Sequence, residues 1–200
     1  MRKTVCLMAF FCLCAVLLAG CGEAKVPDVI EAPTAAVTKE GEVLVWLLGD
    51  FDKGYYSLSE LTEMAVNEAV RFCTARQKET AAVVEKVETV QGGKVMVAYK
   101  FDGYDSCSEF LGGVFFFGTV SEAIEKGFSM DVIMRSVGDN SLFTEAQLRQ
   151  AADRYLVITD MNVNIYCPCK VTHISNGALV NGDGSIDPSM TEGPVYILMK

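Results

Sequence analysis

Residues 81–102 read AAVVEKVETVQGGKVMVAYKFD, and this stretch decides the fold that the sequence predicts. From Lys94 to Phe101 large apolar residues alternate with smaller or charged ones, a period of two that is typical of a half-buried β-strand. The β-branched run from Ala82 to Val90 predicts a strand before it. Gly92-Gly93 favours a two-residue turn between the two. We therefore expect an antiparallel hairpin at this point.

A helix is expected upstream of this hairpin. Ser57 followed by Glu60 matches the capping box that begins many helices. Apolar residues then recur at helical spacing, so that Leu58 to about Gln77 should form an amphipathic helix.

The remaining elements are shorter. Thr119 and Thr144 each precede an acid or amide by three residues and predict two short helices, and a helical turn is expected at 104–113. Short apolar runs predict strands at 43–48, 114–117, 155–159, 163–166, 170–174 and 194–199. The predicted class is α+β: a mostly antiparallel sheet with one long amphipathic helix and two or three short helices.

The N-terminal residues are typical of a targeting signal. Arg2 and Lys3 precede an apolar run from Val5 to Ala19, which is typical of a secretory leader and short for a membrane helix of about 20 residues. The sequence Leu18-Ala19-Gly20-Cys21 resembles the lipobox of bacterial lipoproteins. That resemblance implies cleavage before Cys21 and attachment of a diacylglycerol to its sulfur, with palmitate-type chains that anchor the protein to the membrane.

Three parts follow from this interpretation. Residues 1–20 are a lipoprotein signal peptide, residues 21–41 are an acylated cysteine with a flexible tether, and residues 42–200 are a single α+β domain. Cleavage removes two of the 17 basic residues and none of the 26 acidic ones, which leaves a formal charge of −11. Such a charge argues against nucleic acid as a partner, and we expect a lipid-anchored domain on the extracytoplasmic face of the cell membrane.

Two stretches, EVLVWLLGDFDKGYYSLSELTEM (42–64) and FLGGVFFFGTVSEAIEKGF (110–128), resemble a group of small lipoproteins of Firmicutes-type bacteria. The resemblance extends over residues 42–175 and includes PCKVTHIS (168–175), where the group more often has Pro-Gly-Lys-Ile-x-Tyr-x-Ser. It implies placement at the membrane and carries no assigned activity. Cys169 and His173 depart from the group pattern, which argues against a chemistry shared by the group at these positions.

The segment DFDKGYY (50–56) holds the candidate binding residues Asp50, Asp52, Tyr55 and Tyr56. Paired acids and aromatic rings in a loop are typical of a ligand-facing surface. The same residues also suit a strand-to-helix turn, where acids favour the helix dipole and an aromatic residue staples the first turn. Both interpretations stand at this stage.

Two possible metal-binding patterns are weak. Asn181, Asp183, Gly184 and Asp187 match part of a calcium loop, but Leu179 and Met190 occupy its first and last ligand positions. Cys167, Cys169 and His173 fall on one side of a strand, but Cys-x-Cys is a poor zinc chelate. We predict no metal and no cofactor.

The four cysteines of the predicted domain leave two alternatives. Outside the cell, Cys73, Cys107, Cys167 and Cys169 could form two disulfides, or they could remain buried thiols. Cys107 within DSCSEF faintly resembles the nucleophile of cell-wall cysteine peptidases, with His173 as the base. The glycines that follow it end the helix too soon for that family.

No set of nucleophile, base and orienting group is therefore credible. We expect a non-catalytic binding or envelope-interaction module, not an enzyme, with an envelope protein or a small ligand as its partner. The alternatives are a small solute-binding lipoprotein that serves a transporter and a cell-wall cysteine hydrolase.

Overall fold

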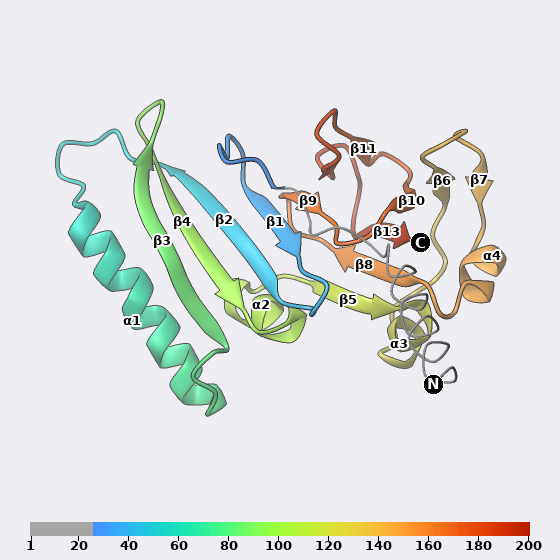
Figure 1. The fold of residues 1–200 in the computed structure, drawn as a ribbon, viewed down its shortest axis with the longest axis horizontal. Helices are drawn as coiled ribbons and strands as arrows, with labels where there is room; N and C mark the ends of the chain where they lie inside the picture. The colour runs from blue at the N-terminus through green and yellow to red at the C-terminus, as the bar shows by residue number, and fades with distance from the viewer. Residues whose placement is uncertain (1–25) are drawn as a thin grey trace, which may run out of the picture.

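The computed structural model describes residues 26–200 and is built mainly from β-strands (Figure 1). Strands make up 35% of it and helices 22%, and the strands form two sheets of seven and six strands. The α+β class predicted above is therefore wrong, because the fold is β-rich. The cause lies in strands of only two residues in the C-terminal half, such as β11 (Leu179–Val180) and β12 (Ile186–Asp187), which are too short to give a periodic signal.

Sheet A has the strand order β11-β12-β9-β1-β2-β4-β3. The pairs β1–β2, β2–β4 and β4–β3 are antiparallel, whereas β1 and β9 run parallel. The loop between β3 and β4 has three residues, Gln91–Gly93, one more than predicted, and both of its glycines have positive φ. The remaining strands of sheet A are β1 (Thr34–Val37), β2 (Val43–Asp50), β3 (Ala82–Val90), β4 (Lys94–Phe101) and β9 (Asn164–Tyr166).

Sheet B has the strand order β5-β8-β13-β10-β6-β7 and is antiparallel throughout. Its strands are β5 (Phe115–Thr119), β6 (Met134–Ser136), β7 (Leu142–Phe143), β8 (Tyr155–Thr159), β10 (Val171–Ser175) and β13 (Val195–Met199).

The folded part begins before the predicted boundary at Glu42. Thr34–Val37, within the stretch predicted to be a tether, form β1, a fully buried strand between β2 and β9. Its four small residues are too few to show a period, and the two prolines nearby suggested a linker. Residues 1–25, which include the predicted leader and Cys21, lie outside the described residues.

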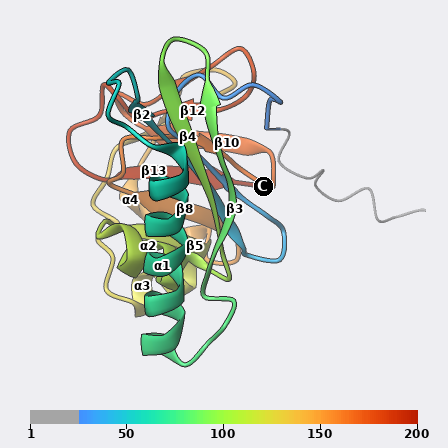
Figure 2. The ribbon, with the colours of Figure 1, turned by 90° about the vertical axis from the view of Figure 1, so that its left-hand side faces the viewer.

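Four helices complete the described chain. They are α1 (Leu58–Arg76), α2 (Tyr104–Leu111), α3 (Val120–Glu125) and α4 (Glu145–Gln150). The capping boxes predicted at Thr119 and Thr144 are both formed. Figure 2, which faces the β3 edge of sheet A, shows α1 running alongside β3.

Two apolar cores hold the molecule together. The larger core joins the inner face of sheet A, including Val45, Tyr99 and Phe101, to sheet B residues such as Val157 and Ile197. The smaller core lies on the other face of sheet B, where Phe116, Leu156, Ile158 and Leu198 meet residues of α3, α4 and the loop after α3. Both faces of sheet B are thus covered.

The outer face of sheet A is different. The cross-strand pairs of Trp46 with Ala98, and of Leu48 with Met96, place these four side chains on one face. None of them belongs to either core. On this face Met96 and Ala98 are buried, whereas Trp46 and Leu48 are half-buried.

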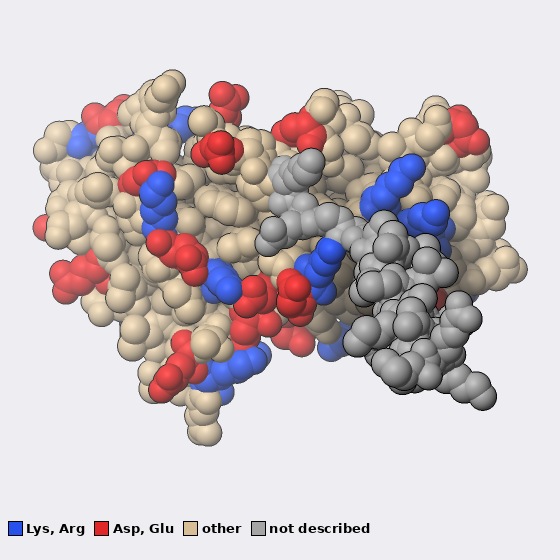
Figure 3. All heavy atoms as spheres, in the orientation of Figure 1, with Lys and Arg blue, Asp and Glu red and all other residues tan. Residues whose placement is uncertain are grey.

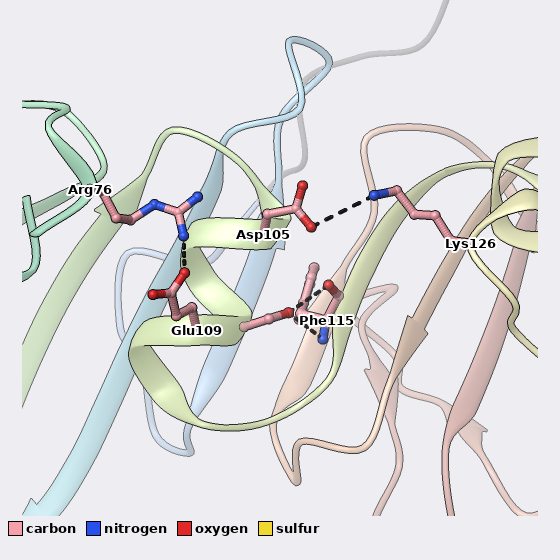
Figure 4. Close-up of polar contacts among 6 residues, drawn as sticks. Arg76, Asp105, Glu109, Phe115 and Lys126 are labelled. Carbon is pink, nitrogen blue, oxygen red and sulfur yellow. Dashed lines mark hydrogen bonds and ion pairs between the residues drawn. The ribbon is translucent and has the colours of Figure 1, made fainter.

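Helix α2 contacts elements on both sides of it (Figure 4). Glu109 pairs with Arg76 at the end of α1, and Asp105 lies 3.9 Å from the Lys126 ammonium after α3. Between them the Ser108 hydroxyl donates to the Phe115 carbonyl and accepts from the Phe115 N–H, both at 2.8 Å. One short helix therefore connects α1, β5 and α3.

Candidate functional site

The predicted binding residues lie in an exposed loop between β2 and α1. Tyr55 and Tyr56 meet edge to face with centroids 4.9 Å apart, and Phe51 stacks on Tyr56 at 5.2 Å. Asp52 pairs with its neighbour Lys53 at 3.2 Å. The loop thus presents three aromatic rings beside an ion pair.

Local structure accounts for much of this loop. The Phe51 N–H donates to the Gly93 carbonyl at 2.7 Å, which fixes the loop to the β3–β4 turn. Asp50 ends β2 opposite Lys94. Ser57 accepts from the Glu60 N–H and caps α1. The structure therefore gathers Tyr55 and Tyr56, while Asp50 and Asp52 serve the turn and its local charge balance.

A groove of about 710 Å³ lies between α1 and β3. We call it the α1–β3 groove. Its walls are apolar and its end beside the α1–β3 turn is polar. The lining residues used below are Val66, Ala69, Val70 and Cys73 from α1, Ala82, Val83 and Val84 from β3, and Lys78 and Glu79 from the turn.

The exposure of the groove walls is unusual for an acidic domain. Val70 is 58% exposed and Val66 is 42% exposed, although both are β-branched apolar residues. Met64, which lies on another face of α1, is also exposed. Helix α1 therefore turns an apolar stripe toward solvent and buries chiefly the small residues Ala65 and Ala69.

Cys73 links the two walls of the groove. Its sulfur lies 3.2 Å from the Ala82 carbonyl oxygen and 3.3 Å from the Glu79 carbonyl oxygen, and the two acceptors share its single hydrogen. The Ala82 N–H in turn donates to the Cys73 sulfur at 3.4 Å. The backbone groups of Ala82 that face away from β4 are thus satisfied by a side chain instead of a strand.

Two basic residues near the groove have acidic partners, whereas Arg71, next to Val70 on α1, forms no ion pair with a described residue. Lys78 pairs with Asp102, and Lys86 pairs with Glu88 at 2.7 Å. Glu79 and Glu85 form no ion pair with any described residue. Of the two charged residues in the lining, Lys78 and Glu79, Glu79 is therefore the one without an ion pair.

The wider surface shows the same balance. On the face drawn in Figure 3, basic side chains lie next to acidic ones and form no continuous basic stripe over the described residues. Lys100 pairs with Glu42 at 2.9 Å, for example.

The nucleophile and base of the hydrolase hypothesis are not brought together. Cys107 is fully buried in α2, and burial raises the pKa of its thiol to about 12. His173 stacks on Phe143 with centroids 4.0 Å apart, and its Nδ1 lies 3.0 Å from the Thr172 hydroxyl. Within residues 26–200, no hydrogen bond joins Cys107 to His173. A thiolate–imidazole pair is therefore not formed.

The zinc pattern is not assembled either. Nowhere in the described chain do three His, Cys, Asp or Glu side chains group where they could hold a metal ion. Burial, with a smaller contribution from Cys169, raises the pKa of the Cys167 thiol to about 12. Cys73, Cys107 and Cys167 are thiols and not disulfide partners.

The partial calcium loop is a hairpin turn. Asp183 accepts from the Tyr166 hydroxyl, and from the Ser185 N–H and hydroxyl at 2.9 and 2.7 Å. These bonds lower the pKa of Asp183, with the Tyr166 bond first among them, while burial and Asp183 raise the pKa of Tyr166 to about 12. The carboxylate that would bind calcium thus holds β9 to the β11–β12 turn.

Sequence reasoning missed the groove. The helical spacing of Leu61, Ala65, Ala69 and Phe72 predicted the buried side of α1 but did not explain the valines on its other side. Val66 and Val70, four residues apart, were the available signal, because they form a second apolar row.

Comparison with known protein families, curated proteins and solved structures gives no match. No helix of the part described is long and apolar enough to span a bilayer.

Proposed function

We propose that this protein is a lipoprotein anchored through Cys21 to the extracytoplasmic face of the cell membrane, and that its domain binds a partner in the α1–β3 groove without catalysis. The observation that carries the proposal is the exposed apolar lining of the groove on a chain with a net acidic charge. Exposed apolar patches with polar rims are typical of binding sites.

The position of β1 gives the anchor a short reach. Thirteen residue steps separate Cys21 from Thr34, the first residue of β1. Fully extended, they span at most about 45 Å. A domain joined to its anchor by such a short segment stays close to the membrane surface, which suits a partner that is also bound to the envelope.

The second candidate is a small solute-binding lipoprotein that serves a transporter. The groove volume of about 710 Å³ favours it, because it falls within the usual range for small-molecule sites. Native mass spectrometry of the purified lipoprotein separates the two candidates. A co-purified small molecule that is lost in a Val70→Asp variant would support the solute receptor.

Metabolic labelling with an alkyne fatty acid tests the anchor. We expect the parent to be labelled and Cys21→Ala to be unlabelled, since the lipobox sulfur is the acceptor. Cys73→Ala is the matched control and should be labelled like the parent. Equal labelling of Cys21→Ala and the parent would contradict the proposal.

A further inference from the structure

We infer that the α1–β3 groove binds an extended, apolar polypeptide segment with Lys or Arg at its flanks, added to sheet A as a further strand beside β3. This inference rests on the proposed function, since it names the partner chemistry of the same groove. It follows from the free edge of the sheet, the direction of its backbone groups, the helix beside it and the charge of the rim.

The edge comes first. β3 has nine residues, pairs with β4 on one side and ends sheet A on the other. An edge strand presents backbone N–H and C=O groups that another chain can pair with. Helix α1 packs against this same strand, so that the groove combines a strand edge with a helix wall (Figure 2).

The backbone of β3 points into the groove. The Ala82 N–H and C=O are bonded to the Cys73 thiol, and Cys73 is part of the lining. Alternate residues of a strand direct their backbone groups to the same edge. Val84 is therefore the next residue whose N–H and C=O face the groove, and a partner strand would pair with it.

The helix supplies the pockets. In strand addition, main-chain hydrogen bonds provide affinity and alternate side chains enter pockets. The lining on the helix side runs from Val66 to Gln77, the residue that caps the end of α1, about 16 Å along the helix axis. That length matches about five residues of an added strand at about 3.3 Å each. Val66 and Val70 would contact every second side chain of the segment.

The charge of the rim selects the flanks. Lys78 and Lys86 are already paired, whereas Glu79 and Glu85 form no ion pair with a described residue. Glu79 lies in the lining and Glu85 follows directly after Val84, so a carboxylate stands near each end of the lined part of β3. Basic flanking residues would complement both.

The rest of the edge disfavours a second copy of this chain. The register of β3 shifts between Val84 and Lys86, and beyond that shift the charged residues Lys86 and Glu88 are exposed and half-buried, respectively. Bulges and charges of this kind protect an edge strand from self-pairing. Backbone pairing with a partner is therefore centred on Val84, because Cys73 already bonds the N–H and C=O of Ala82, and the rest of the segment would contact α1.

Binding of labelled peptides to the mature lipoprotein in phosphatidylcholine nanodiscs tests the inference. The probe is acetyl-Lys-Val-Thr-Val-Thr-Val-Lys-amide, and its two controls carry Glu at both ends or N-methyl groups on alternate residues. We expect both controls to bind at least about tenfold more weakly in fluorescence anisotropy, since they lose charge complementarity or hydrogen bonds. Bound probe should also slow hydrogen exchange of the Val84 amide.

Two protein variants separate the possible failures. Val70→Asp, at an exposed position, should weaken probe binding by about tenfold or more. Val180→Asp is the matched control on β11, the opposite edge of sheet A, and should bind like the parent. If Val70→Asp weakens binding of the probe but the parent protein binds the N-methylated probe as tightly as the unmodified one, strand addition is overturned and the groove remains a binding site. Both proposals would be overturned if Val70→Asp, Val180→Asp and the parent bound every ligand tested with equal affinity. They would also be overturned if the parent did not bind the probe and were a dimer that Val70→Asp converts to a monomer.

Discussion

Sheets A and B differ in what covers their faces. Sheet B has apolar packing on both sides, from the inner face of sheet A and from α3 and α4. Sheet A contributes only its inner face to the larger core, and its outer face carries Trp46 and Leu48 outside either core. Sheet B is therefore the structural centre of the molecule.

The edges of the sheets differ as well. In sheet A, β3 ends the sheet beside the α1–β3 groove. The other three edge strands are shorter than the nine residues of β3: β5 and β7 in sheet B have five and two, and β11 in sheet A has two. Long edges invite partners and very short edges do not. The contrast places stability in sheet B and binding capacity in sheet A.

The largest expected effect on stability comes from truncating a leucine to alanine, a change that can be made in both sheets. Leu156→Ala empties a fully buried position of the smaller core and should lower the free energy of unfolding by about 2 to 5 kcal/mol. Leu48→Ala removes the same atoms from the half-buried outer face of sheet A and should cost about 1 kcal/mol or less. Urea denaturation measures both, and equal losses would break the comparison.

An intermediate effect is expected at the helix caps. Thr119 accepts from the Glu122 N–H, and Glu122 accepts from the Thr119 N–H at 2.6 Å, so Thr119→Ala should cost about 1 kcal/mol. Ser57 at the start of α1 makes a single exposed cap bond of 3.3 Å. Ser57→Ala should therefore cost less than Thr119→Ala in thermal unfolding. A larger loss from Ser57→Ala would argue that α1 is as tightly coupled to folding as α3.

The smallest effect concerns pH. His173, the only histidine, lies in sheet B, and burial followed by the charge of Arg154 lowers its pKa. Because the unfolded chain binds the proton more readily, this contribution to stability is present above the unfolded pKa of about 6.5 and is lost as pH falls below it. His173→Gln should flatten the fall in unfolding free energy between about pH 7 and about pH 5. An unchanged slope in this variant would assign the pH dependence to carboxyl groups.

Local elements could be predicted from the sequence, because their signals lie within a few residues. The capping box at Thr119, the helix from Leu58 and the strand from Lys94 all follow from short-range patterns. The pairing of β1 with β9 could not be predicted, since it joins residues about 130 positions apart through backbone bonds that any sequence can make. The division into two sheets depends on such long-range pairs.

The candidate site divides in the same way. The aromatic loop of Tyr55 and Tyr56 was evident from composition alone. The groove was not, because the exposure of Val66 and Val70 depends on β3 being the last strand of its sheet, which is a property of the topology. From the sequence alone, an apolar residue in a helix is predicted to be buried, and only the topology shows that no further strand covers it.

The insertion of β1 between β2 and β9 also affects biosynthesis. A ribosome releases Thr34–Val37 long before Asn164–Tyr166, so a nascent chain holds one side of β1 open for most of its synthesis. Non-local pairing of this kind slows folding and prolongs exposure to aggregation. A chain truncated before residue 164 should therefore require a chaperone to remain dispersed.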